Sequence, residues 1–538
     1  MTIKPKYFAL SLFFLLAGVY PGDAALVFNQ QAKQEEIIRE DEFSNYKPQN
    51  FDNLIALNEG SNSNVTNSKI LHAINRLSFG ITPGDTDKVR KIGVKRYIKQ
   101  QLSPSNIPEP QILTSQLREL QTLNLNYRQI YHRYVPQKGQ KLTKQQRKAL
   151  NKRSRLLKTE ARKARLLRAV HSDRQLQEVM VDFWYNHFNV HGSKEHTRLL
   201  VGIYERDAIR PHVFGKFRDL LGATARHPAM LIYLDNRQNT APNSPRARGR
   251  RKGLNENYAR ELMELHTLGV NGGYTQEDVV TLARIFTGWG ITRNLKNMKN
   301  NSGFYFDSGR HDFSDKVLLG QNIQGRGEEQ GKQALDILAR HPSTASHISY
   351  KLAQYFVADN PPKSLVKRLS KRFLNTDGDI KAVLNTLFES PEFWDTKNFN
   401  NKFKTPLQYV LSVVRATDIK VRNTDRINGF LGQSGMHLYE CRVPDGYKNT
   451  QDAWLSTDAI SRRLSFVTQF AYGGYSSLET PGNKAKNKRQ KRRKPLDADA
   501  LAKTLENYFP NRTQNAIASS PPGLHAAMML GSPEFMRR

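Results

Sequence analysis

The sequence predicts an all-α fold, a multi-helix globular protein with long loops and at most a minor β-hairpin. From residue 67 onward, apolar residues recur mainly at three- and four-residue spacing, as on the buried face of a helix. Helix-start signals are frequent, as in Arg226-His-Pro228 and Thr275-Gln-Glu-Asp278. Alternating strand patterns are scarce; the best is Gly303-Phe-Tyr-Phe306, within a hairpin expected near 300–320.

The first helices can be placed from their apolar spacing. Leu71, Ile74 and Leu77 predict a helix that ends before a loop at 80–84, and a second helix is expected to begin near Asp85. A long basic helix or helix pair is expected over about 140–170. It leads into residues 173–184, where apolar side chains again follow helical spacing.

The later helices are marked mainly by their starts. Arg340-His-Pro342 has the same form as Arg226-His-Pro228, with proline where a first helical turn tolerates it. Ser390-Pro-Glu-Phe393 recurs as Ser532-Pro-Glu-Phe535, again at expected helix starts. Asp379 is expected to cap a helix that begins at Ile380.

The N-terminus has the pattern of a secretory signal peptide over residues 1–24. Lys4 and Lys6 precede a 14-residue apolar run, and Gly22-x-Ala24 supplies the small residues of a cleavage site. Such a run is shorter than the roughly 20 residues of a membrane span. We therefore expect an exported protein of the periplasm or extracellular space, with no membrane span after signal removal. Residues 25–67 are expected to form a disordered tail, and 68–538 a single large helical domain.

The cysteine count limits the cofactor classes. Cys441 is the only cysteine, so no intramolecular disulfide can form. Zinc sites of the Cys₄ or Cys₂His₂ type and the Cys-x-x-Cys-His haem signature are excluded for the same reason. The chain also lacks a phosphate-binding Gly-x-x-x-x-Gly-Lys-Ser/Thr loop, so there is no haem, nucleotide or iron–sulfur signature. A divalent metal is the one cofactor that the sequence leaves open.

The formal net charge of +34 is concentrated in a few segments. Residues 128–168 carry a net charge of +14, residues 484–494 a net +8 and residues 246–252 a net +5. We interpret them as basic inserts near 128–168, 240–253 and 480–497, which would attract acidic polysaccharide or another polyanion. Residues 246–252 and 484–494 contain no aromatic side chains to stack on bases, which argues against nucleic acid as the partner.

One segment carries a distinctive motif, Asn255-Glu-Asn-Tyr-Ala-Arg-Glu-Leu-Met-Glu-Leu-His-Thr-Leu-Gly-Val-Asn-Gly-Gly-Tyr-Thr-Gln-Glu-Asp278. It closely resembles the signature of a large bacterial family of exported proteins catalogued as domain of unknown function 1800. Other blocks resemble that family in the same order, and they are Arg76-Leu-Ser-Phe-Gly-Ile-Thr-Pro-Gly84, Phe183-Trp-Tyr-Asn-His-Phe-Asn-Val190, Ala208-Ile-Arg-Pro-His212, His227-Pro-Ala-Met-Leu-Ile-Tyr-Leu-Asp-Asn236, Phe286-Thr-Gly-Trp289, Lys351-Leu-Ala and Phe356-Val-Ala-Asp-Asn-Pro-Pro362.

The resemblance covers roughly residues 70–538 and implies an exported helical protein. It implies no reaction, because the activity of the family is itself unassigned. Family members are often encoded beside proteins that resemble sulfatases. The resemblance therefore implies a sulfatase-like companion protein as a partner and work on the envelope or on polysaccharide.

The segment 255–278 supplies the candidate catalytic residues, and its residues allow two interpretations. On a helix over 255–268, Glu256, Arg260 and Glu264 would form one stripe, in which Arg260 bridges two glutamates on the surface. Alternatively, the acidic residues and the imidazole act as metal ligands or as an acid–base pair. The catalytic candidates are Glu256, Glu261, Glu264 and His266, with Asn255, Asn257 and Arg260 as binding candidates.

Two further places carry candidate binding residues. Asn186 and His187 end an aromatic-rich block, and His191 lies four residues later, the spacing of a helical zinc pair. Gly192 suggests that the helix is already ending there, so a zinc pair is disfavoured. His311 and Asp312 form a dipeptide that could orient a ligand or cap a turn.

These observations lead to two main hypotheses and a weaker one. The first is an envelope hydrolase or lyase in which Glu261 and His266 line a cleft with His187 or His311. The second is a non-catalytic helical scaffold that binds acidic glycans or an envelope partner. Export-coupled nucleic-acid binding rests on charge alone and is the weakest. The first requires that the acidic and histidine side chains converge from elements that are distant in sequence.

Overall fold

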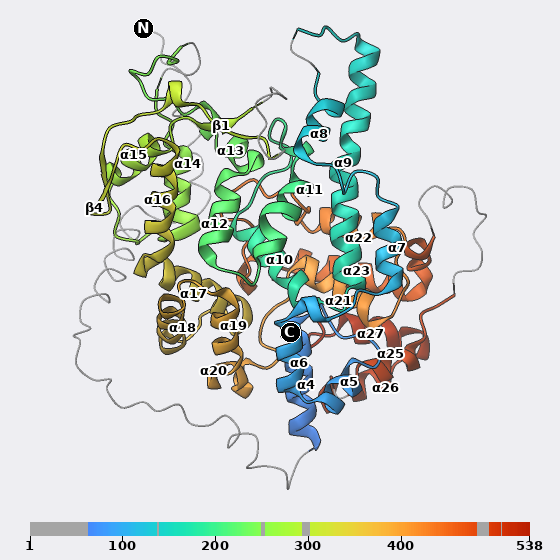
Figure 1. Cartoon of the computed structure of the whole chain (residues 1–538). Helices are drawn as coiled ribbons and strands as arrows, with labels where there is room; N and C mark the ends of the chain where they lie inside the picture. The colour runs from blue at the N-terminus through green and yellow to red at the C-terminus, as the bar shows by residue number, and fades with distance from the viewer. Residues whose placement is uncertain (1–62, 137–138, 249–252, 293–301, 481–493, 507) are drawn as a thin grey trace, which may run out of the picture. The chain divides into compact units, whose positions relative to one another are not determined.

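The computed structural model describes residues 63–136, 139–248, 253–292, 302–480, 494–506 and 508–538 (Figure 1). By its contacts, the chain from residue 61 to residue 538 groups together as one unit. The expected signal peptide and nearly all of the expected tail over 25–67 lie outside the described residues. The first helix of the described residues begins at Ser63, four residues before the start that apolar spacing indicates.

Helices account for most of the described residues, which confirms the predicted all-α class. They are α4 (Ser63–Leu77), α5 (Asp85–Ile92), α6 (Val94–Gln101), α7 (Gln111–Arg118), α8 (Tyr127–Tyr134), α9 (Lys144–His171), α10 (Gln175–His187), α11 (Val201–Tyr204), α12 (Phe217–Arg226), α13 (Pro228–Tyr233), α14 (Asn257–Glu261), α15 (Gln276–Ile285), α16 (Glu328–Arg340), α17 (Pro342–Phe356), α18 (Lys363–Asn375), α19 (Ile380–Phe388), α20 (Pro391–Trp394), α21 (Pro406–Ala416), α22 (Asp425–Gln433), α23 (Thr457–Gln469), α24 (Ser476–Glu479), α25 (Ala498–Thr504), α26 (Asn511–Ala518) and α27 (His525–Gly531).

Two segments between these helices, η3 (Glu205–Ile209) and η6 (Leu262–Thr267), are π-helical, with a wider turn than an α-helix. A third segment, η12 (Phe470–Gly474), is kinked at Tyr472 and Gly473, whose backbone angles are not helical. The first two lie next to the candidate sites described below. In the part of the chain that the structure describes, no helix is long and apolar enough to cross a membrane.

The strands form two small antiparallel pairs. β1 (Trp289–Ile291) pairs with β2 (Phe304–Phe306), and Gly290 lies opposite Tyr305. β3 (Lys316–Leu318) pairs with β4 (Gln321–Ile323), and Val317 lies opposite Asn322. The strand expected at 304–306 is therefore confirmed, although its partner lies before the predicted range and a second pair follows it.

The helix starts agree with the sequence signals. The His227 and His341 rings each accept a hydrogen bond from a backbone N–H two residues later, so each caps the helix that its proline begins. Thr275 and Asp278 form the expected capping box, with Thr275 Oγ1 accepting from the Asp278 N–H at 3.2 Å. Asp379 caps α19 as expected, because its Oδ1 accepts from the Ala382 N–H.

The basic segment 128–168 differs from the predicted insert. It contains α8 and most of the 28-residue α9, and the second half of α9 is packed in the protein interior. Arg165 on that half is buried and forms an ion pair with Asp182 at 2.5 Å. The insert interpretation is wrong for this half because distant acidic residues offset its charge. Residues 249–252 and 481–493, within the other two basic inserts, lie outside the described residues.

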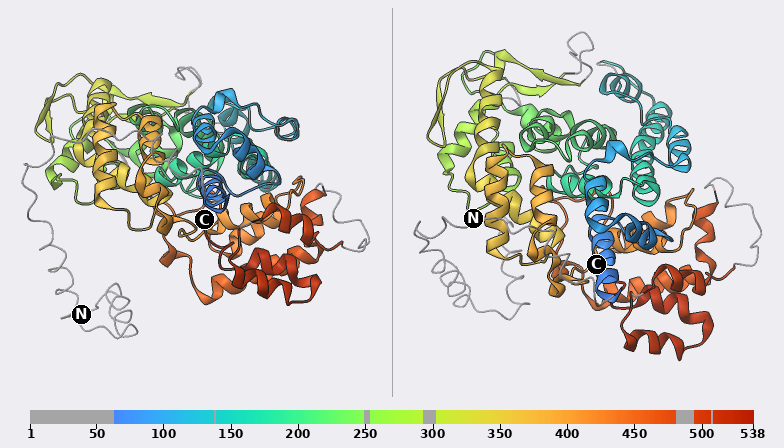
Figure 2. Two further views of the ribbon diagram at one scale, coloured as in Figure 1. Left: turned by 90° about the horizontal axis from the view of Figure 1, so that it is seen from below. Right: turned by 60° about the horizontal axis from the view of Figure 1, so that its bottom comes forward.

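The helices gather in groups that can be followed in two figures. Helices α16 to α19 lie together, drawn in yellow to gold, while α25 to α27 form a separate group drawn in red (Figure 2). Helix α9 runs beside α7 and α8 (Figure 1). Helix α10 is largely buried and touches both α4 and α9. Its C-terminal residues reach the π-helix η6, helix α17 and the loop 436–450, which together form the candidate site.

Candidate functional site

Residues 255–268 of the motif segment do not form the continuous α-helix that their spacing predicts. Helix α14 ends at Glu261 and continues as the π-helix η6 over Leu262–Thr267, and Gly269 then ends it with a φ of +86°. A π-helical turn holds an extra residue, so side chains after Glu261 rotate away from the expected stripe. π-helical turns are frequent at functional sites.

The rotation changes the expected ion pairs. Arg260 donates to Glu256 at 3.2 Å and to the side-chain oxygen of Gln276 at 2.8 Å. Among the described residues, Arg260 forms no ion pair with Glu264. The expectation that Arg260 bridges two glutamates is therefore wrong for Glu264. Glu256 and Arg260 instead link α14 to α15 at the surface.

His266, on η6, lies beside His187, the last residue of α10. The His187 Nε2 donates to the His266 carbonyl oxygen at 3.1 Å, and the two ring centroids are 6.0 Å apart. Because a carbonyl can only accept, the His187 proton is on Nε2 and its Nδ1 has a bare lone pair. Nδ1 is buried and has no hydrogen-bond partner among the described residues.

The His266 ring is held in a similar way. It donates to the Pro444 carbonyl, and its Nε2 is buried without a hydrogen-bond partner among the residues that the structure describes. Burial, followed by the nearby Lys351 ammonium, lowers the pKa of His266 to about 3. Burial likewise lowers the pKa of His187 well below its usual value. Both imidazoles are therefore neutral near pH 7, and each presents one bare nitrogen.

Helix α17 adds a third histidine and a lysine. The His347 ring centroid lies 6.2 Å from that of His187, and its Nε2 is 3.4 Å from the Leu265 carbonyl oxygen. Burial lowers the pKa of His347 to about 4 and that of Lys351 to about 8. Lys351 lies close enough to lower the pKa of all three imidazoles, and Asp445 partly offsets its charge.

The loop 441–447 reaches the same place from the C-terminal half of the chain. Asn189 Nδ2 donates to the carbonyl oxygens of Cys441 at 3.0 Å and Val443 at 2.7 Å. The Tyr233 hydroxyl donates to the Arg442 carbonyl oxygen at 2.7 Å. These hydrogen bonds fix the loop so that the side chain of Asp445, which is 30% exposed, lies near Lys351 and Glu261.

The surroundings of Glu261 disfavour its charged form. Burial raises the pKa of Glu261, and the nearby carboxylates of Glu264 and Asp445 raise it further. Glu261 is partly buried, as are Glu264 and Asp445. The polar cluster consists of His187, Glu261, His266, His347, Lys351 and Asp445, and it draws on α10, α14, η6, α17 and the loop 441–447.

The remaining candidates of this region have structural partners. Asn186 forms hydrogen bonds with both the backbone N–H and the carbonyl oxygen of Tyr447. The Asn255 Oδ1 accepts from the Asn257 N–H at 3.1 Å, and Asn257 Nδ2 donates to the Leu234 carbonyl oxygen at 3.2 Å. These two asparagines therefore shape the turn into α14.

His311 and Asp312 belong to a different local network. His311 Nδ1 lies 2.7 Å from the Thr287 carbonyl oxygen, and its Nε2 lies 2.8 Å from Gln330 Oε1. Asp312 accepts from the Ser314 hydroxyl at 2.6 Å, and hydrogen bonds to Ser314 help to lower its pKa against the effect of burial. These contacts join the end of α15 to α16, and no contact recorded for the described residues joins His311 to the polar cluster.

The described residues contain no group of three or more His, Cys, Asp or Glu side chains arranged to hold a metal ion. His191 does not pair with His187, because α10 ends at His187 and His191 Nδ1 lies 3.7 Å from Glu440. The zinc pair is therefore not formed in this structure.

Sequence analysis did not single out His347, Lys351, Asp445 or Asn189 as site residues. Lys351 and Asn189 lie within blocks that carry the family resemblance, which was the one available signal. Asp445 lies in Pro444-Asp-Gly-Tyr447, a turn-forming sequence that by itself indicates only a loop.

Comparison with protein families identifies the chain. Residues 72–537 match the family model described as "Protein of unknown function (DUF1800)". The chain belongs to this family. No curated protein and no solved structure matches it. The DUF1800 match includes every residue of the polar cluster and extends through the last helix.

Proposed function

We propose that this protein is exported to the periplasm or beyond and carries out acid–base chemistry on an anionic polymer of the cell envelope. The observation that carries the proposal is the polar cluster, in which neutral imidazoles with bare nitrogens lie beside Lys351 and a carboxyl group of raised pKa, Glu261. Support for export comes from the basic and apolar residues of the first 24 positions.

The cluster contains the groups that an acid–base reaction needs. Near neutral pH the unprotonated fraction of Lys351, whose pKa is about 8, can accept a proton. The His266 and His347 imidazoles, with pKa values of about 3 and 4, stay neutral and can accept hydrogen bonds from a substrate. A carboxyl group of raised pKa can donate a proton to a leaving group. Lys351 also attracts an anionic substrate. Hydrolysis and β-elimination of an acidic glycan both use a general base together with a general acid. A sulfatase-like companion protein would act on the same class of polymer.

The test is turnover of acidic polysaccharides by the purified full chain. Alginate, polygalacturonate, hyaluronan and heparin are incubated with the protein; new reducing ends report both reactions, and ultraviolet absorbance of unsaturated products reports elimination. Glu261→Gln should lower the rate by about 10²–10⁴-fold, as expected for loss of a general acid. His266→Gln, which removes a bare ring nitrogen from the cluster, should lower the rate as well. Glu277→Gln, an exposed carboxylate on α15, is the control and should keep full activity.

The controls also show which result would end the catalytic proposal. Each variant is compared with the parent by its unfolding midpoint, so that loss of activity is separated from loss of fold. A folded Glu261→Gln protein and a folded His266→Gln protein that both keep parental turnover would exclude a catalytic role for the cluster.

A second candidate function is binding of an acidic glycan without catalysis, and a groove between α17 and α18 favours it. Lys363, Lys367 and Lys371 lie at four-residue intervals along α18 and are exposed, so they share one face of the helix. They line the groove with Tyr350, which is 39% exposed and offers a ring on which a sugar can stack. The residues that line this groove include no acid.

This candidate is tested by retention on immobilised heparin in a salt gradient. Replacing Lys363, Lys367 and Lys371 by Gln should make the protein elute at lower salt, whereas Lys88, Lys91 and Lys99, exposed on α5 and α6, serve as a charge-matched control triple. Equal shifts for the two triples would show that retention follows net charge and not the groove. Normal turnover by the groove triple would separate binding here from catalysis at the polar cluster.

A further inference from the structure

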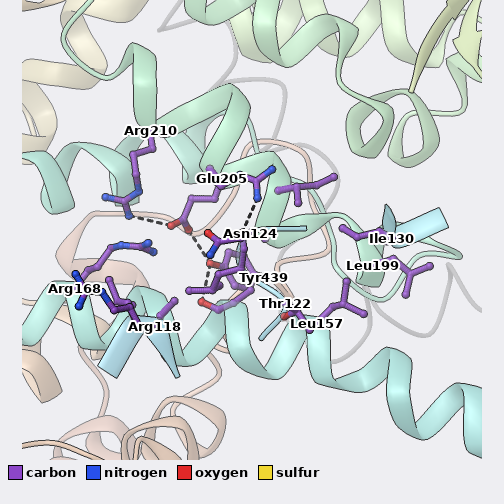
Figure 3. A pocket seen from close by; sticks show the side chains of 17 residues that line it. Arg118, Thr122, Asn124, Ile130, Leu157, Arg168, Leu199, Glu205, Arg210 and Tyr439 are labelled. Atoms are coloured by element: carbon purple, nitrogen blue, oxygen red, sulfur yellow. Dashed lines mark hydrogen bonds and ion pairs between the residues drawn. The ribbon is translucent and has the colours of Figure 1, made fainter. Parts of the chain in front are cut away.

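A cavity of about 180 Å³ lies beside α9, away from the residues of the polar cluster. Side chains from α7, α8, α9, α11 and the π-helix η3 line it, and Tyr439 contributes from the loop 436–450 (Figure 3). Pockets that enclose a whole drug-sized ligand measure roughly 300–1,000 Å³. This cavity therefore fits a small molecule or one terminal group of a larger one.

Most charged groups around the cavity are already paired. Arg210 donates to Glu178 at 2.5 and 2.9 Å and to Glu205 at 3.1 Å. Glu205 also accepts from the Tyr439 hydroxyl at 2.7 Å. Arg206 donates to Asp207 and to two backbone carbonyls. These three acids and two arginines thus hold the wall of the cavity in place.

Arg168 is different. It lines the cavity from α9, yet its guanidinium makes no hydrogen bond or ion pair with any of the described residues. Burial lowers the pKa of Arg168, and the nearby Arg210 lowers it further, although the group stays charged near neutral pH. A partly buried guanidinium with five unused N–H donors is costly unless an acceptor is supplied. Arg118, exposed at the rim, is likewise without a recorded partner.

The cavity has a basic end and an apolar end. Figure 3 shows Arg118, Arg168 and Arg210 on one side, while Ile130, Leu157 and Leu199 lie on the opposite side. A bare inorganic anion would use only the first side. A ligand that fills both sides carries an oxyanion group on a short apolar body.

We propose that this cavity binds a small organic anion, with its carboxylate, sulfate or phosphate group on Arg168 and its apolar body against Ile130, Leu157 and Leu199. The guanidinium fork matches the two oxygens of such a group. Tyr439 has a φ of +61°, and Cys441 two residues later begins the loop segment of the polar cluster. The cavity and the polar cluster therefore lie at opposite ends of one loop. The binding proposal does not rest on the proposed function.

The test is binding of defined probes to the full chain at low salt. Hexanoate and hexyl sulfate carry both features, inorganic sulfate and phosphate carry only the anion, and hexanol carries only the apolar body. Binding is followed by calorimetry and by the rise of the unfolding midpoint with probe concentration. Hexanoate or hexyl sulfate should bind at least about tenfold more tightly than hexanol, sulfate or phosphate, which corresponds to one decade in the dissociation constant.

Three variants decide whether the organic anions bind in this cavity. Arg168→Gln should weaken hexanoate and hexyl sulfate binding at least about tenfold, the same decade in the dissociation constant, and leave hexanol unchanged. Arg118→Gln changes an exposed residue, so it should fold normally and weaken binding less. Arg155→Gln changes an exposed arginine on α9, the helix that carries Arg168, and should bind the probes like the parent. The proposal is overturned if no organic anion binds, if inorganic sulfate binds as tightly as hexyl sulfate, or if Arg168→Gln binds hexanoate and hexyl sulfate as tightly as the parent.

Discussion

Asn186 binds the backbone of Tyr447 with both ends of its side-chain amide. Its Nδ2 donates to the Tyr447 carbonyl oxygen at 2.7 Å, and its Oδ1 accepts from the Tyr447 N–H at 2.7 Å. Gly446 lies so close that an added Cβ would stand 2.2 Å from the Asn186 carbonyl oxygen, and its φ is +76°. The last turn of α10 thus fixes the loop that carries Asp445.

Asn186→Ala should therefore loosen this loop. It removes two hydrogen bonds to a partly buried backbone, and a cost of about 1–3 kcal/mol in the free energy of unfolding is expected. Urea denaturation measures the cost, and amide hydrogen exchange should show faster exchange over 441–447. Asn515→Ala, exposed on α26, is the control. Unchanged exchange over 441–447 in the Asn186 variant would mean that other contacts hold the loop.

Lys351→Met should make the protein more stable near neutral pH. Burial lowers the pKa of Lys351 from 10.5 to about 8, so the unfolded chain binds more protons between these two values. The stability contributed by Lys351 therefore rises with pH over this window, and the penalty is fully present below about pH 8. Removing it should raise the free energy of unfolding at pH 7 by up to about 3 kcal/mol, since one pKa unit is about 1.4 kcal/mol.

The pH dependence distinguishes this effect from better packing. The advantage of Lys351→Met over the parent should shrink as pH rises from about 8 toward 10.5. Lys88→Met, at an exposed position on α5, should show no such trend. An advantage that stays constant across this range would show that the methionine packs better and that Lys351 is not electrostatically penalised.

His266→Gln should reduce the acid sensitivity of the fold. The pKa of His266 is about 3 in the folded protein and 6.5 in the unfolded chain, so the unfolded state binds more protons between these two pH values. The stability associated with neutral His266 is fully present above about pH 6.5 and is lost as pH falls toward 3. The variant should lose stability less steeply than the parent in urea titrations between pH 6.5 and 4. His132→Gln, an exposed position on α8, should follow the parent curve.

The sequence predicted the helical fold because caps and apolar spacing are local signals. The Thr275 and Asp278 capping box, the Asp379 cap and the prolines at 228 and 342 all require only residues a few positions apart. The π-helix η6 could not be read in this way, since an i to i+5 turn uses the same residue types as an α-helix. The prediction that Glu264 shares one helix face with Glu256 and Arg260 was wrong for this reason.

The polar cluster was predictable only in part, because its contacts span long separations in sequence. His187 and His266 were both candidates, and the structure brings them together across 79 positions. Asp445 and the loop 441–447 are held by Asn186 and Asn189 across more than 250 positions, which no local pattern reveals. The burial of the second half of α9 was not predicted for the same reason. The carboxylates that neutralise its arginines, Asp182 and Glu440, lie outside α9 in the sequence.

Glu205→Gln should destabilise the protein strongly. Burial raises the pKa of Glu205, but the guanidinium groups of Arg165 and Arg210 outweigh it and hold the pKa below its usual value. Loss of the negative charge leaves these two guanidinium groups without their anionic partner. The free energy of unfolding should fall by about 3–5 kcal/mol, as expected for breaking a buried ion pair. Equilibrium unfolding in urea measures it, with the exposed Glu119→Gln as control. A change below about 1 kcal/mol, the range of surface pairs, would contradict the network described here.

Deleting residues 484–494 should weaken polyanion binding without unfolding the protein. The segment carries a net charge of +8, and each cation that contacts a polyanion releases counterions. Heparin retention should therefore fall, and binding should depend less steeply on salt concentration than in the parent. The unfolding midpoint should stay nearly unchanged, because the deleted segment offers only one apolar side chain, Ala485, to a core. Combined with the glutamine substitutions at Lys363, Lys367 and Lys371, the deletion should lower retention further, since the two features are separate in sequence. A large loss of stability on deletion would show that the segment is packed against the protein, and the interpretation of 480–497 as a basic insert would be wrong.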